Sequence, residues 1–528
     1  MPDPHAPRTD LTIGGAPARS ADDTPGSLAT VECVGYNQCV APDPLTIDAD
    51  SSNRPFTRRA IVALALIVAV GAALRLHGLQ AESAWLDEAF AVGIARDGLD
   101  RVLYETALDV HPPLYYLLLT TWGPLFGTGI GAARLFSVVC SLGVIVAAHV
   151  VGTRLAGRRV GLIAAMLLAV SPFQIEFAQE ARMYAQLTLL ATLSTYGFTR
   201  LFEPRRLRWF LFYVVVTSLM TYTQVYGLFI IGAQALTLVV DIAWRRRAAL
   251  DATGAWIAAQ ALVFAAFLWW LPVFTWQVSL VQTSFWIAEP EPMGFLGAFR
   301  AYAASPGMLT LLWPLLAIGV YQLARRPAAS APTRPALFFV LPWLAGPILF
   351  PFVLSLVSSP IFLPKYTIAA SVPFAIVGAA GIAALPFRLV RAAVLVACVA
   401  LSVRGLPSYY SISTKDGWRD AVPLVEAQAS TDDAVVLYPY FNKIAFDFYR
   451  TRDDLQVRPF PLFAPPPPPD GWPVALARAT AGRDRIWFVT LQADASSAPV
   501  LEALNVDYEQ TSLLVQQRIA IYRLDRRQ

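Results

Sequence analysis

Two adjacent carboxylates, Asp87 and Glu88, follow the first long apolar run of the chain, within the segment Trp85-Leu-Asp-Glu-Ala-Phe90. Charged groups beside a membrane are costly to remove from water, so they need an explanation. A structural explanation places both in the first turn of a surface helix capped by Ser83, where the helix dipole stabilises them. A chemical explanation makes one of them a general base for a hydroxyl. The segment alone favours the structural explanation.

A histidine lies in the same region, in the segment Asp109-Val-His-Pro-Pro-Leu-Tyr-Tyr116. The two prolines fix the backbone and prevent a helix from forming ahead of Leu114. His111 is then either an interfacial residue beside an aromatic belt or a hydrogen-bond donor to a phosphate or sugar oxygen.

A second polar cluster holds Glu176, Glu180 and Arg182 within seven residues, between two apolar runs. The i, i+4 spacing of Glu180 and Tyr184 predicts that they share one helix face. A local glutamate–arginine pair on a surface would contribute little stability. Farther on, Lys365 and Tyr366 begin another apolar run. Lys365 either snorkels to the interface or neutralises a lipid phosphate as a point charge.

The composition shows what kind of protein must position these groups. The chain has 528 residues, of which 56% are hydrophobic and 15% are charged. Soluble domains carry about 25% charged residues. The balance excludes a soluble globular protein, a disordered chain and a nucleic-acid binder with a basic field, and the net charge is only +4. We therefore predict a polytopic α-helical membrane protein with soluble attachments.

Clusters of arginine set the predicted topology, because positive charge beside a membrane span stays in the cytoplasm. Arg54, Arg58 and Arg59 precede the first apolar run, which places the N-terminus inside. The later clusters pair the apolar runs as hairpins, giving about eleven transmembrane helices and an extracytoplasmic C-terminus. The predicted spans are 60–79, 133–153, 160–173, 183–202, 209–225, 227–244, 255–273, 298–323, 336–357, 366–385 and 389–406.

The chain divides into three predicted parts. Residues 1–58 read as a disordered cytoplasmic tail, residues 59–406 as the transmembrane domain and residues 407–528 as an extracytoplasmic α/β domain. In the last part, apolar runs shrink to strand length at Ala434–Tyr438, Arg485–Leu491 and Arg518–Leu524. Helix-like stretches lie at Trp418–Ala429 and Asn442–Arg450, and a five-proline run, Pro465–Pro469, predicts an extended linker. The four cysteines predict no disulfide framework.

One short apolar run, Pro112 to Phe126, suits an interfacial or re-entrant segment better than a span. The longest outer loop then runs from Gln80 to about Ala132 and contains both Asp87 and His111. Under the same topology Glu180 lies in the second outer loop. The two loops face one another across the outer surface, and this convergence strengthens the chemical explanation of the acids.

Four motifs together resemble the motif series of glycosyltransferase family 39, the GT-C group that includes protein O-mannosyltransferases and lipid A aminoarabinose transferases. They are Trp85-Leu-Asp-Glu-Ala-Phe, His111-Pro-Pro-Leu-Tyr-Tyr, Gln179-Glu-Ala-Arg-Met-Tyr, and Lys365-Tyr with the following Pro373. The resemblance covers about residues 60–406 and extends weakly to Asp416-Gly-Trp-Arg419. It implies a GT-C-like membrane enzyme that moves a sugar from a polyprenyl-phosphate carrier to an acceptor on the outer face. One departure is Lys365, where the family commonly has arginine; lysine keeps the charge but loses the bidentate fork.

The resemblance implies a role for each polar group. Asp87 would be the family's first-loop acid, the base in a single displacement that inverts the sugar carbon, and Glu88 and Glu180 would support it or orient the acceptor. Contacts to the donor phosphate would come from five other residues, namely His111, Arg182, Tyr184, Lys365 and Tyr366. The three carboxylates also suit a divalent ion such as Mg²⁺ or Mn²⁺, although no tight metal site is evident.

The expected partners are a polyprenyl-phosphate sugar, with mannose one candidate, membrane lipid, and a glycan, lipid or protein acceptor; no nucleic acid is expected. The expected location is a bacterial plasma membrane. Two other classes stay open: a lipid transporter or flippase, and a non-catalytic protein that binds polyprenyl lipid. A transporter places ionisable groups near the bilayer midplane. Here the interior runs are nearly free of acids, with Asp241 the clearest exception, beside a cytoplasmic arginine cluster.

Overall fold

The computed structural model describes residues 56–203, 207–283, 287–328, 331–412, 415–460, 471–491 and 497–528. Most of the predicted N-terminal tail, with Cys33 and Cys39, lies outside these residues, and so does the five-proline run. Cys140 and Cys398 are described; both are buried, unpaired thiols.

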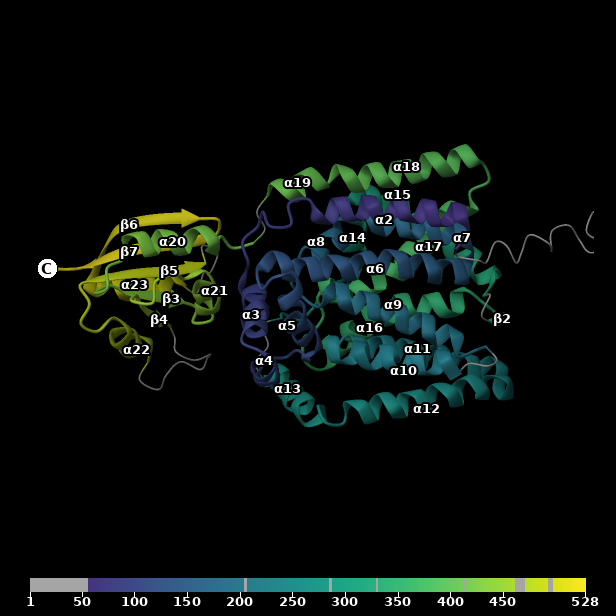
Figure 1. The fold of residues 1–528 in the computed structure, drawn as a ribbon, viewed down its shortest axis with the longest axis horizontal. Helices are drawn as coiled ribbons and strands as arrows, with labels where there is room; N and C mark the ends of the chain where they lie inside the picture. The colour runs from purple at the N-terminus through teal and green to yellow at the C-terminus, as the bar shows by residue number, and fades with distance from the viewer. Residues whose placement is uncertain are drawn as a thin grey trace, which may run out of the picture. The chain divides into compact units, whose positions relative to one another are not determined.

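Long helices make up most of residues 58–411 (Figure 1). Each of the eleven predicted spans overlaps a helix or a pair of consecutive helices. The helices are α2 (Arg58–Leu76), α6 (Ile130–Ala156), α7 (Arg158–Val170) with α8 (Pro172–Ala178), α9 (Tyr184–Arg200), α10 (Leu207–Thr223), α11 (Gly227–Arg245), α12 (Leu250–Phe267), α15 (Pro306–Arg325), α16 (Leu337–Val357), the 3₁₀ helix η2 (Pro364–Ala370) with α17 (Ser371–Ala384), and α18 (Arg388–Arg404) with α19 (Leu406–Ser411). In the described residues, eight of these helices are long and apolar enough to cross a bilayer, or nine with the bent pair α7–α8; α9 and α10 are shorter, at 17 residues each.

Two predicted spans are interrupted. α7 and α8 meet at an angle of 62°, where Pro172 begins α8 and Ser171 caps it by accepting a hydrogen bond from the Gln174 amide. The predicted span 298–323 is wrong in its first turns. A short helix, α14 (Leu296–Ala303), ends at Ala304, whose left-handed backbone (φ 58°) separates it from α15.

Three short helices lie at one end of the long ones and form the predicted outer loop (Figure 1). They are α3 (Leu86–Arg96), α4 (Leu99–Leu108) and α5 (Leu114–Phe126). The short apolar run predicted to be interfacial or re-entrant is α5, which is 13 residues long and too short to span a bilayer. α13 (Leu271–Thr283) is bonded to the end of α4. The side-chain amide of Gln277 donates hydrogen bonds to the carbonyls of Thr106 and Asp109, at 2.8 Å each.

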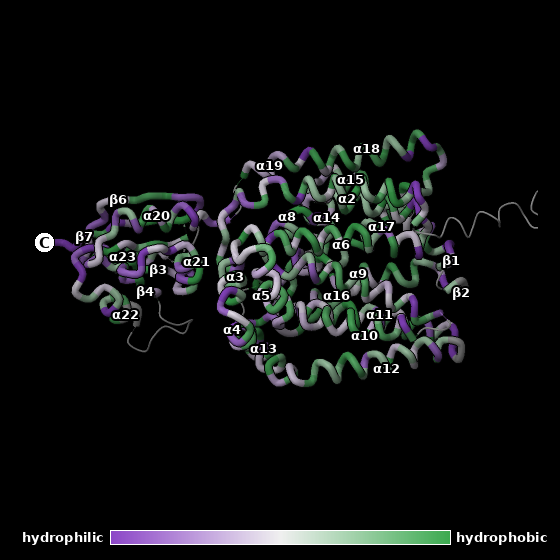
Figure 2. Tube along the Cα trace, viewed as in Figure 1, coloured by the Kyte–Doolittle hydropathy of each residue, from purple (hydrophilic) through white to green (hydrophobic). Residues whose placement is uncertain are grey.

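Arginines gather at the ends of the long helices that lie opposite to α3, α4 and α5, where Figure 2 shows hydrophilic colour on the loops. Arg154 at the end of α6 pairs with Glu203 just after α9. Arg334 on the short hairpin β1 (Pro327–Ala328) and β2 (Ala331–Pro335) pairs with Asp241 of α11 through two hydrogen bonds, at 2.9 and 2.6 Å. The acid that stood out in the sequence is therefore neutralised beside the arginine clusters.

Helix α17, which follows the Lys365 segment, packs against α15 with backbone in contact. Gly319 of α15 faces the carbonyl oxygen of Val377, and Gly381 of α17 faces that of Leu315; a Cβ at either glycine would collide with it. α15 and α17 can therefore approach more closely than bulkier residues would permit. This packing fixes η2, which leads into α17.

The C-terminal part is a five-stranded mixed sheet with helices, as predicted. Its strand order is β4-β3-β5-β7-β6, with β3 parallel to β4 and β5, and β7 antiparallel to β5 and β6. The strands are β3 (Ala434–Tyr438), β4 (Gln456–Pro459), β5 (Arg485–Leu491), β6 (Tyr508–Gln516) and β7 (Ile519–Arg526), and the helices are α20 (Trp418–Gln428), α21 (Asn442–Tyr449), α22 (Gly471–Thr480) and α23 (Ser497–Asp507). β3 and β5 are buried along almost their whole length, which explains their continuous apolar sequence.

Candidate active site

The two adjacent acids begin helix α3, as predicted, but Ser83 does not cap it. Trp85 is the N-cap residue and makes no side-chain capping hydrogen bond. The Ser83 hydroxyl instead accepts a hydrogen bond from the Arg419 amide at 3.1 Å. Both acids lie in the first turn, where free amide groups favour negative charge.

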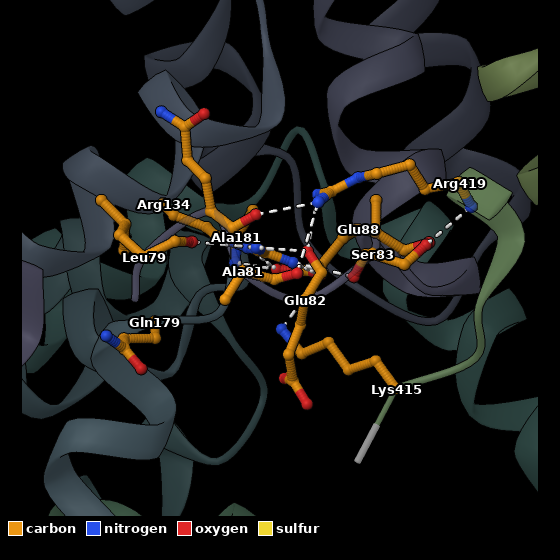
Figure 3. A network of polar contacts seen from close by, with 12 residues as sticks. Leu79, Ala81, Glu82, Ser83, Glu88, Arg134, Gln179, Ala181, Lys415 and Arg419 are labelled. Atoms are coloured by element: carbon orange, nitrogen blue, oxygen red, sulfur yellow. Dashed lines mark hydrogen bonds and ion pairs between the residues drawn. The ribbon is translucent and has the colours of Figure 1, made fainter. Parts of the chain in front are cut away.

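Glu88 is completely buried and bonded at both oxygens (Figure 3). The Arg134 guanidinium donates to Oε1 at 2.9 Å and to Oε2 at 2.7 Å, in a bidentate fork. The Lys415 ammonium also donates to Oε2, at 3.1 Å, and the Ala181 amide donates to Oε1, at 2.8 Å. Burial alone would raise the pKa of Glu88, but Lys415 and Arg134 outweigh it and lower the pKa to about 2.

Both oxygens of Glu88 are therefore occupied by groups of the protein itself. Its oxygens join the first predicted outer loop to Arg134 of α6 and to Ala181 of the second predicted outer loop. The predicted convergence of the two loops is therefore made through Glu88. A carboxylate whose pKa is about 2 is also a weak base, because proton transfer is most effective near the operating pH.

Asp87 differs from its neighbour in being accessible. Its side chain is 33% exposed, and its Oδ2 lies 3.6 Å from a guanidinium nitrogen of Arg182. The same guanidinium donates to the Asp87 carbonyl and to the Tyr116 hydroxyl, each at 3.4 Å. The local Glu180–Arg182 pair considered from the sequence is replaced by this pair between the two loops.

Arg182 is a buried cation with long contacts. It is only 4% exposed, and its Nε has no hydrogen-bond partner among the described residues. Burial alone would lower its pKa, but Tyr116, Asp87 and other neighbouring groups raise it well above the ordinary value, so the charge persists. A buried cation with unused donor capacity, next to an accessible carboxylate, is suited to binding an anion such as phosphate.

His111 lies near the same arginine but is not a cation. Burial, and then the positive charge of Arg182, lowers its pKa to about 3. The sequence grouped His111 with Arg182 and Lys365 as a phosphate contact. With this pKa the imidazole is neutral near pH 7 and offers one N–H donor, so its predicted phosphate contact would be a hydrogen bond rather than an ion pair.

Tyrosine rings connect the predicted donor-binding residues. Tyr366 stacks with Tyr184, with ring centroids 6.1 Å apart, and meets Tyr226 edge-on at 5.4 Å. Tyr184 is almost completely buried, and its proposed contact with the donor stays a prediction. Lys365 lies with its Nζ 5.3 Å from the Tyr366 ring centroid and 5.7 Å from that of Trp85.

Glu180 occupies a bend between α8 and α9, so the prediction that it shares a helix face with Tyr184 is wrong. Helix α9 begins only at Tyr184. Burial raises the pKa of Glu180 to about 7. Lys415 and Lys365 act in the lowering direction, whereas Glu88 and Glu176 raise it further. A carboxylate with this pKa exchanges protons readily near neutral pH.

Two separate cavities lie beside the Lys365–Tyr366 segment, one lined by each residue. One, of about 340 Å³, has a mainly apolar lining and contains His111 and Tyr366. The other, of about 870 Å³, contains Glu176, Glu180 and Lys365. The arginines of the larger cavity are Arg300 and Arg404. One cavity is thus suited to hydrocarbon and the other to a polar ligand.

The possible divalent ion at Asp87, Glu88 and Glu180 stays a prediction. No group of three histidine, cysteine or acidic side chains in the described part of the chain is arranged to hold a metal ion. The oxygens of Glu88 already accept hydrogen bonds from Arg134, Lys415 and Ala181. A divalent ion shared by Asp87, Glu88 and Glu180 would need these bonds to break.

Sequence reasoning missed two partners of Glu88. Arg134 lies inside an apolar run 46 residues away, and a lone arginine there is itself a signal, because a buried charge needs a partner. Lys415 lies 327 residues away, next to the weakly recognised Asp416-Gly-Trp-Arg419 motif, and no local pattern connects it to Glu88.

Comparison with known proteins supports the resemblance read from the motifs. Residues 110–272 match the family model described as dolichyl-phosphate-mannose-protein mannosyltransferase. This range includes His111, Glu180 and Arg182, but not Asp87 or Lys365. No curated protein sequence matches the chain.

Solved structures extend the similarity to the fold. Crystal structures of ArnT from Cupriavidus metallidurans, apo and bound to undecaprenyl phosphate, align with TM-scores of 0.61 and 0.57. The apo structure is 14% identical, over 88% of this chain and 98% of ArnT. The bound structure is 15% identical, over 87% and 97%. The archaeal oligosaccharyltransferase AglB from Archaeoglobus fulgidus, in complex with an inhibitory peptide and a dolichol-phosphate, aligns with a TM-score of 0.56 and 9% identity, over 88% of this chain and 74% of AglB.

The predicted fold class is therefore confirmed: this is a multi-span membrane protein with the GT-C fold and a small C-terminal sheet. The resemblance to the mannosyltransferase and aminoarabinose transferase group is confirmed in fold, and in sequence over residues 110–272. The prediction of a glycosyltransferase agrees with the family model over residues 110–272.

Proposed function

We propose that this protein transfers a sugar from a polyprenyl-phosphate carrier to an acceptor hydroxyl, with Asp87 as the general base. The observation that carries the proposal is the contrast at the start of α3. Glu88 is closed by cations and an amide, whereas Asp87 is accessible beside the buried cation Arg182. A base must be reachable by its substrate, and a leaving phosphate needs nearby positive charge.

The smaller cavity suits the carrier. Its apolar lining matches a polyprenyl chain, and His111 and Tyr366 supply polar groups at the cavity wall. Arg182 and Lys365 lie close to these residues and would neutralise the phosphate. ArnT bound to undecaprenyl phosphate and AglB bound to a dolichol-phosphate share the fold and support this choice of carrier.

The larger cavity suits the acceptor and the transferred sugar. Its carboxylates and cations can hydrogen-bond hydroxyl groups, which an apolar cavity cannot do. Since Lys365 lines this cavity and Tyr366 lines the other, the donor phosphate and the acceptor would meet at this segment.

The reaction is a single displacement. Asp87 takes the proton of the acceptor hydroxyl, and the hydroxyl oxygen forms a bond to the anomeric carbon of the sugar. The bond from that carbon to the phosphate oxygen breaks, and its electron pair leaves with the polyprenyl phosphate. Attack opposite to the leaving group inverts the anomeric carbon. Arg182 and Lys365 stabilise the charge that develops on the phosphate.

The proposed location is a bacterial plasma membrane, with the arginine-rich helix ends in the cytoplasm. The end that carries α3, α4 and α5 then faces outward, together with the α/β part.

The test uses membranes that contain the wild-type protein, supplied with labelled polyprenyl-phosphate sugars, mannose among them. Label should leave the carrier with wild type and with Asp97→Asn, a matched change at the exposed C-terminal end of α3. It should leave at least about 10²-fold more slowly with Asp87→Asn. Equal rates for the two variants would remove Asp87 from the mechanism, and the absence of transfer from every donor would refute the proposed activity.

A further inference from the structure

The segment Leu79–Trp85, which leads directly into α3, is held on one side by Arg134 (Figure 3). Besides its fork to Glu88, the Arg134 guanidinium donates to the carbonyls of Leu79 at 2.9 Å and of Glu82 and Ser83 at 3.0 Å each. One buried side chain of α6 thus fixes both the segment and the first turn of α3.

The α/β part also binds the segment Leu79–Trp85, through Arg419 and Tyr449. The Arg419 guanidinium donates to the carbonyls of Gln80 at 2.9 Å, Ala81 at 3.3 Å and Glu82 at 2.8 Å. The Ala84 amide donates to the Tyr449 hydroxyl at 2.6 Å. The segment is therefore clamped between two guanidinium groups, one from the membrane part and one from the α/β part.

Lys415 adds a direct contact from the α/β part to the Glu88 carboxylate. It comes just before α20, it is 9% exposed, and its Nζ lies 3.1 Å from Glu88 Oε2. Its charge also acts on Glu180 and Glu176, whose pKa values it works to lower. One cation of the α/β part thus reaches Glu88 and two further acids of the helical part.

We propose that Lys415 is a positioning residue of the transferase, through which the α/β part holds Glu88 and thereby sets the place of Asp87. The inference rests on the proposed function. Asp87 and Glu88 are consecutive in one helical turn, so a shift of Glu88 moves Asp87 relative to Arg182. The α/β part is thus part of the catalytic apparatus without touching the substrate.

The first experiment measures transfer kinetics. We expect Lys415→Met to lower kcat by about 10- to 100-fold, the loss expected when a catalytic group is displaced by about 1 Å. The donor KM should change little, because the apolar cavity has no contact with Lys415. Lys415→Arg keeps the charge and should recover part of the loss. Lys443→Met is the matched control, because Lys443 pairs with Asp447 of α21 on the surface of the same part.

A kcat equal to that of wild type for Lys415→Met would overturn the proposal. So would a loss that Lys443→Met reproduces. A fall in folded protein without a change in kcat per folded molecule would show that Lys415 is only structural.

The second experiment tests the contact without relying on activity. The chain has three lysines, so an amine-acylating reagent followed by mass spectrometry reports each one. Lys443, 40% exposed, should react readily, whereas Lys415 should be protected. Glu88→Gln should raise the labelling of Lys415 and leave that of Lys443 unchanged.

The labelling experiment distinguishes a failure of the Lys415–Glu88 contact from a failure of the proposed function. Equal labelling of Lys415 and Lys443 in the wild-type protein would refute the clamp, whatever the activity. Protection of Lys415 together with absence of transfer from every donor would refute the proposed function and, with it, the positioning role.

Discussion

Both ends of the helical part bury an arginine–carboxylate pair, yet the two pairs differ in their surroundings. Arg334 and Asp241 form a bidentate pair beside the arginine clusters. Arg134 and Glu88 form a similar pair at the opposite end, but Lys415 and the Ala181 amide are added to it, and Asp87 lies next to it. The first pair neutralises a buried charge. We propose that the second holds an accessible acid in place, so that the same kind of bond would serve structure in one region and chemistry in the other.

The largest expected effect separates these two regions directly. Asp87→Asn should lower transfer by about 10²- to 10⁴-fold, because it removes the proposed base. Asp241→Asn should leave the rate per folded molecule within a few-fold of wild type. The measurement is the initial rate of label transfer, normalised to folded protein. A comparable loss in both variants would show that the two regions do not differ as described.

The second expected effect concerns stability. Glu88→Gln leaves Arg134 and Lys415 buried without their counter-charge, so we expect a cost of about 3–5 kcal/mol in the free energy of unfolding. Asp241→Asn should destabilise by a similar amount, since Arg334 loses its partner. Thermal unfolding in detergent tests both. A Glu88→Gln variant as stable as wild type would contradict the network in Figure 3.

Glu88 also predicts how stability changes with pH. Its pKa is about 2 in the folded chain, against an ordinary value of 4.5. Because the folded value is lower, the stabilisation is present above about pH 4.5 and is lost as the pH falls toward 2. The unfolding temperature of wild type should therefore fall over this window more steeply than that of Glu88→Gln. Parallel curves would show that Glu88 does not titrate as inferred.

The smallest expected effect is a pH dependence of the transfer rate that arises from Glu180 and not from Glu88. The pKa of Glu180 is about 7, so its ionised fraction rises as the pH passes from 6 to 8. If its carboxylate orients the acceptor, the wild-type rate should increase up to about tenfold over that range. Glu180→Gln should be slower and should lose this dependence. An unchanged pH profile for the variant would remove Glu180 from the acceptor site.

The elements of the site follow from local sequence patterns to a large extent. Apolar runs and arginine clusters predicted the helices, and the strand-length runs predicted β3 and β5, because hydrophobic pattern and burial are tightly linked. The first turn of α3 was predicted as well. Its capping by Ser83 was not correct, because that hydroxyl is bonded to the Arg419 amide, far along the chain.

The unpredicted features depend on distant partners. Glu88 and Lys415 are 327 residues apart, so no spacing rule connects them. The neutral state of His111 depends on burial and on Arg182, neither of which a local motif describes. The bend at Glu180 replaced the helical turn that its spacing to Tyr184 indicated, since the Ala181 amide is bonded to Glu88.

The central claim is that Asp87 performs the chemical step while Glu88 holds it in place. The most direct test is a single-turnover measurement on purified Asp87→Asn, with donor binding measured on the same sample. The account predicts that a labelled polyprenyl-phosphate sugar binds with nearly wild-type affinity and that the rate of sugar transfer falls by at least about 10²-fold. A wild-type single-turnover rate in Asp87→Asn would contradict it.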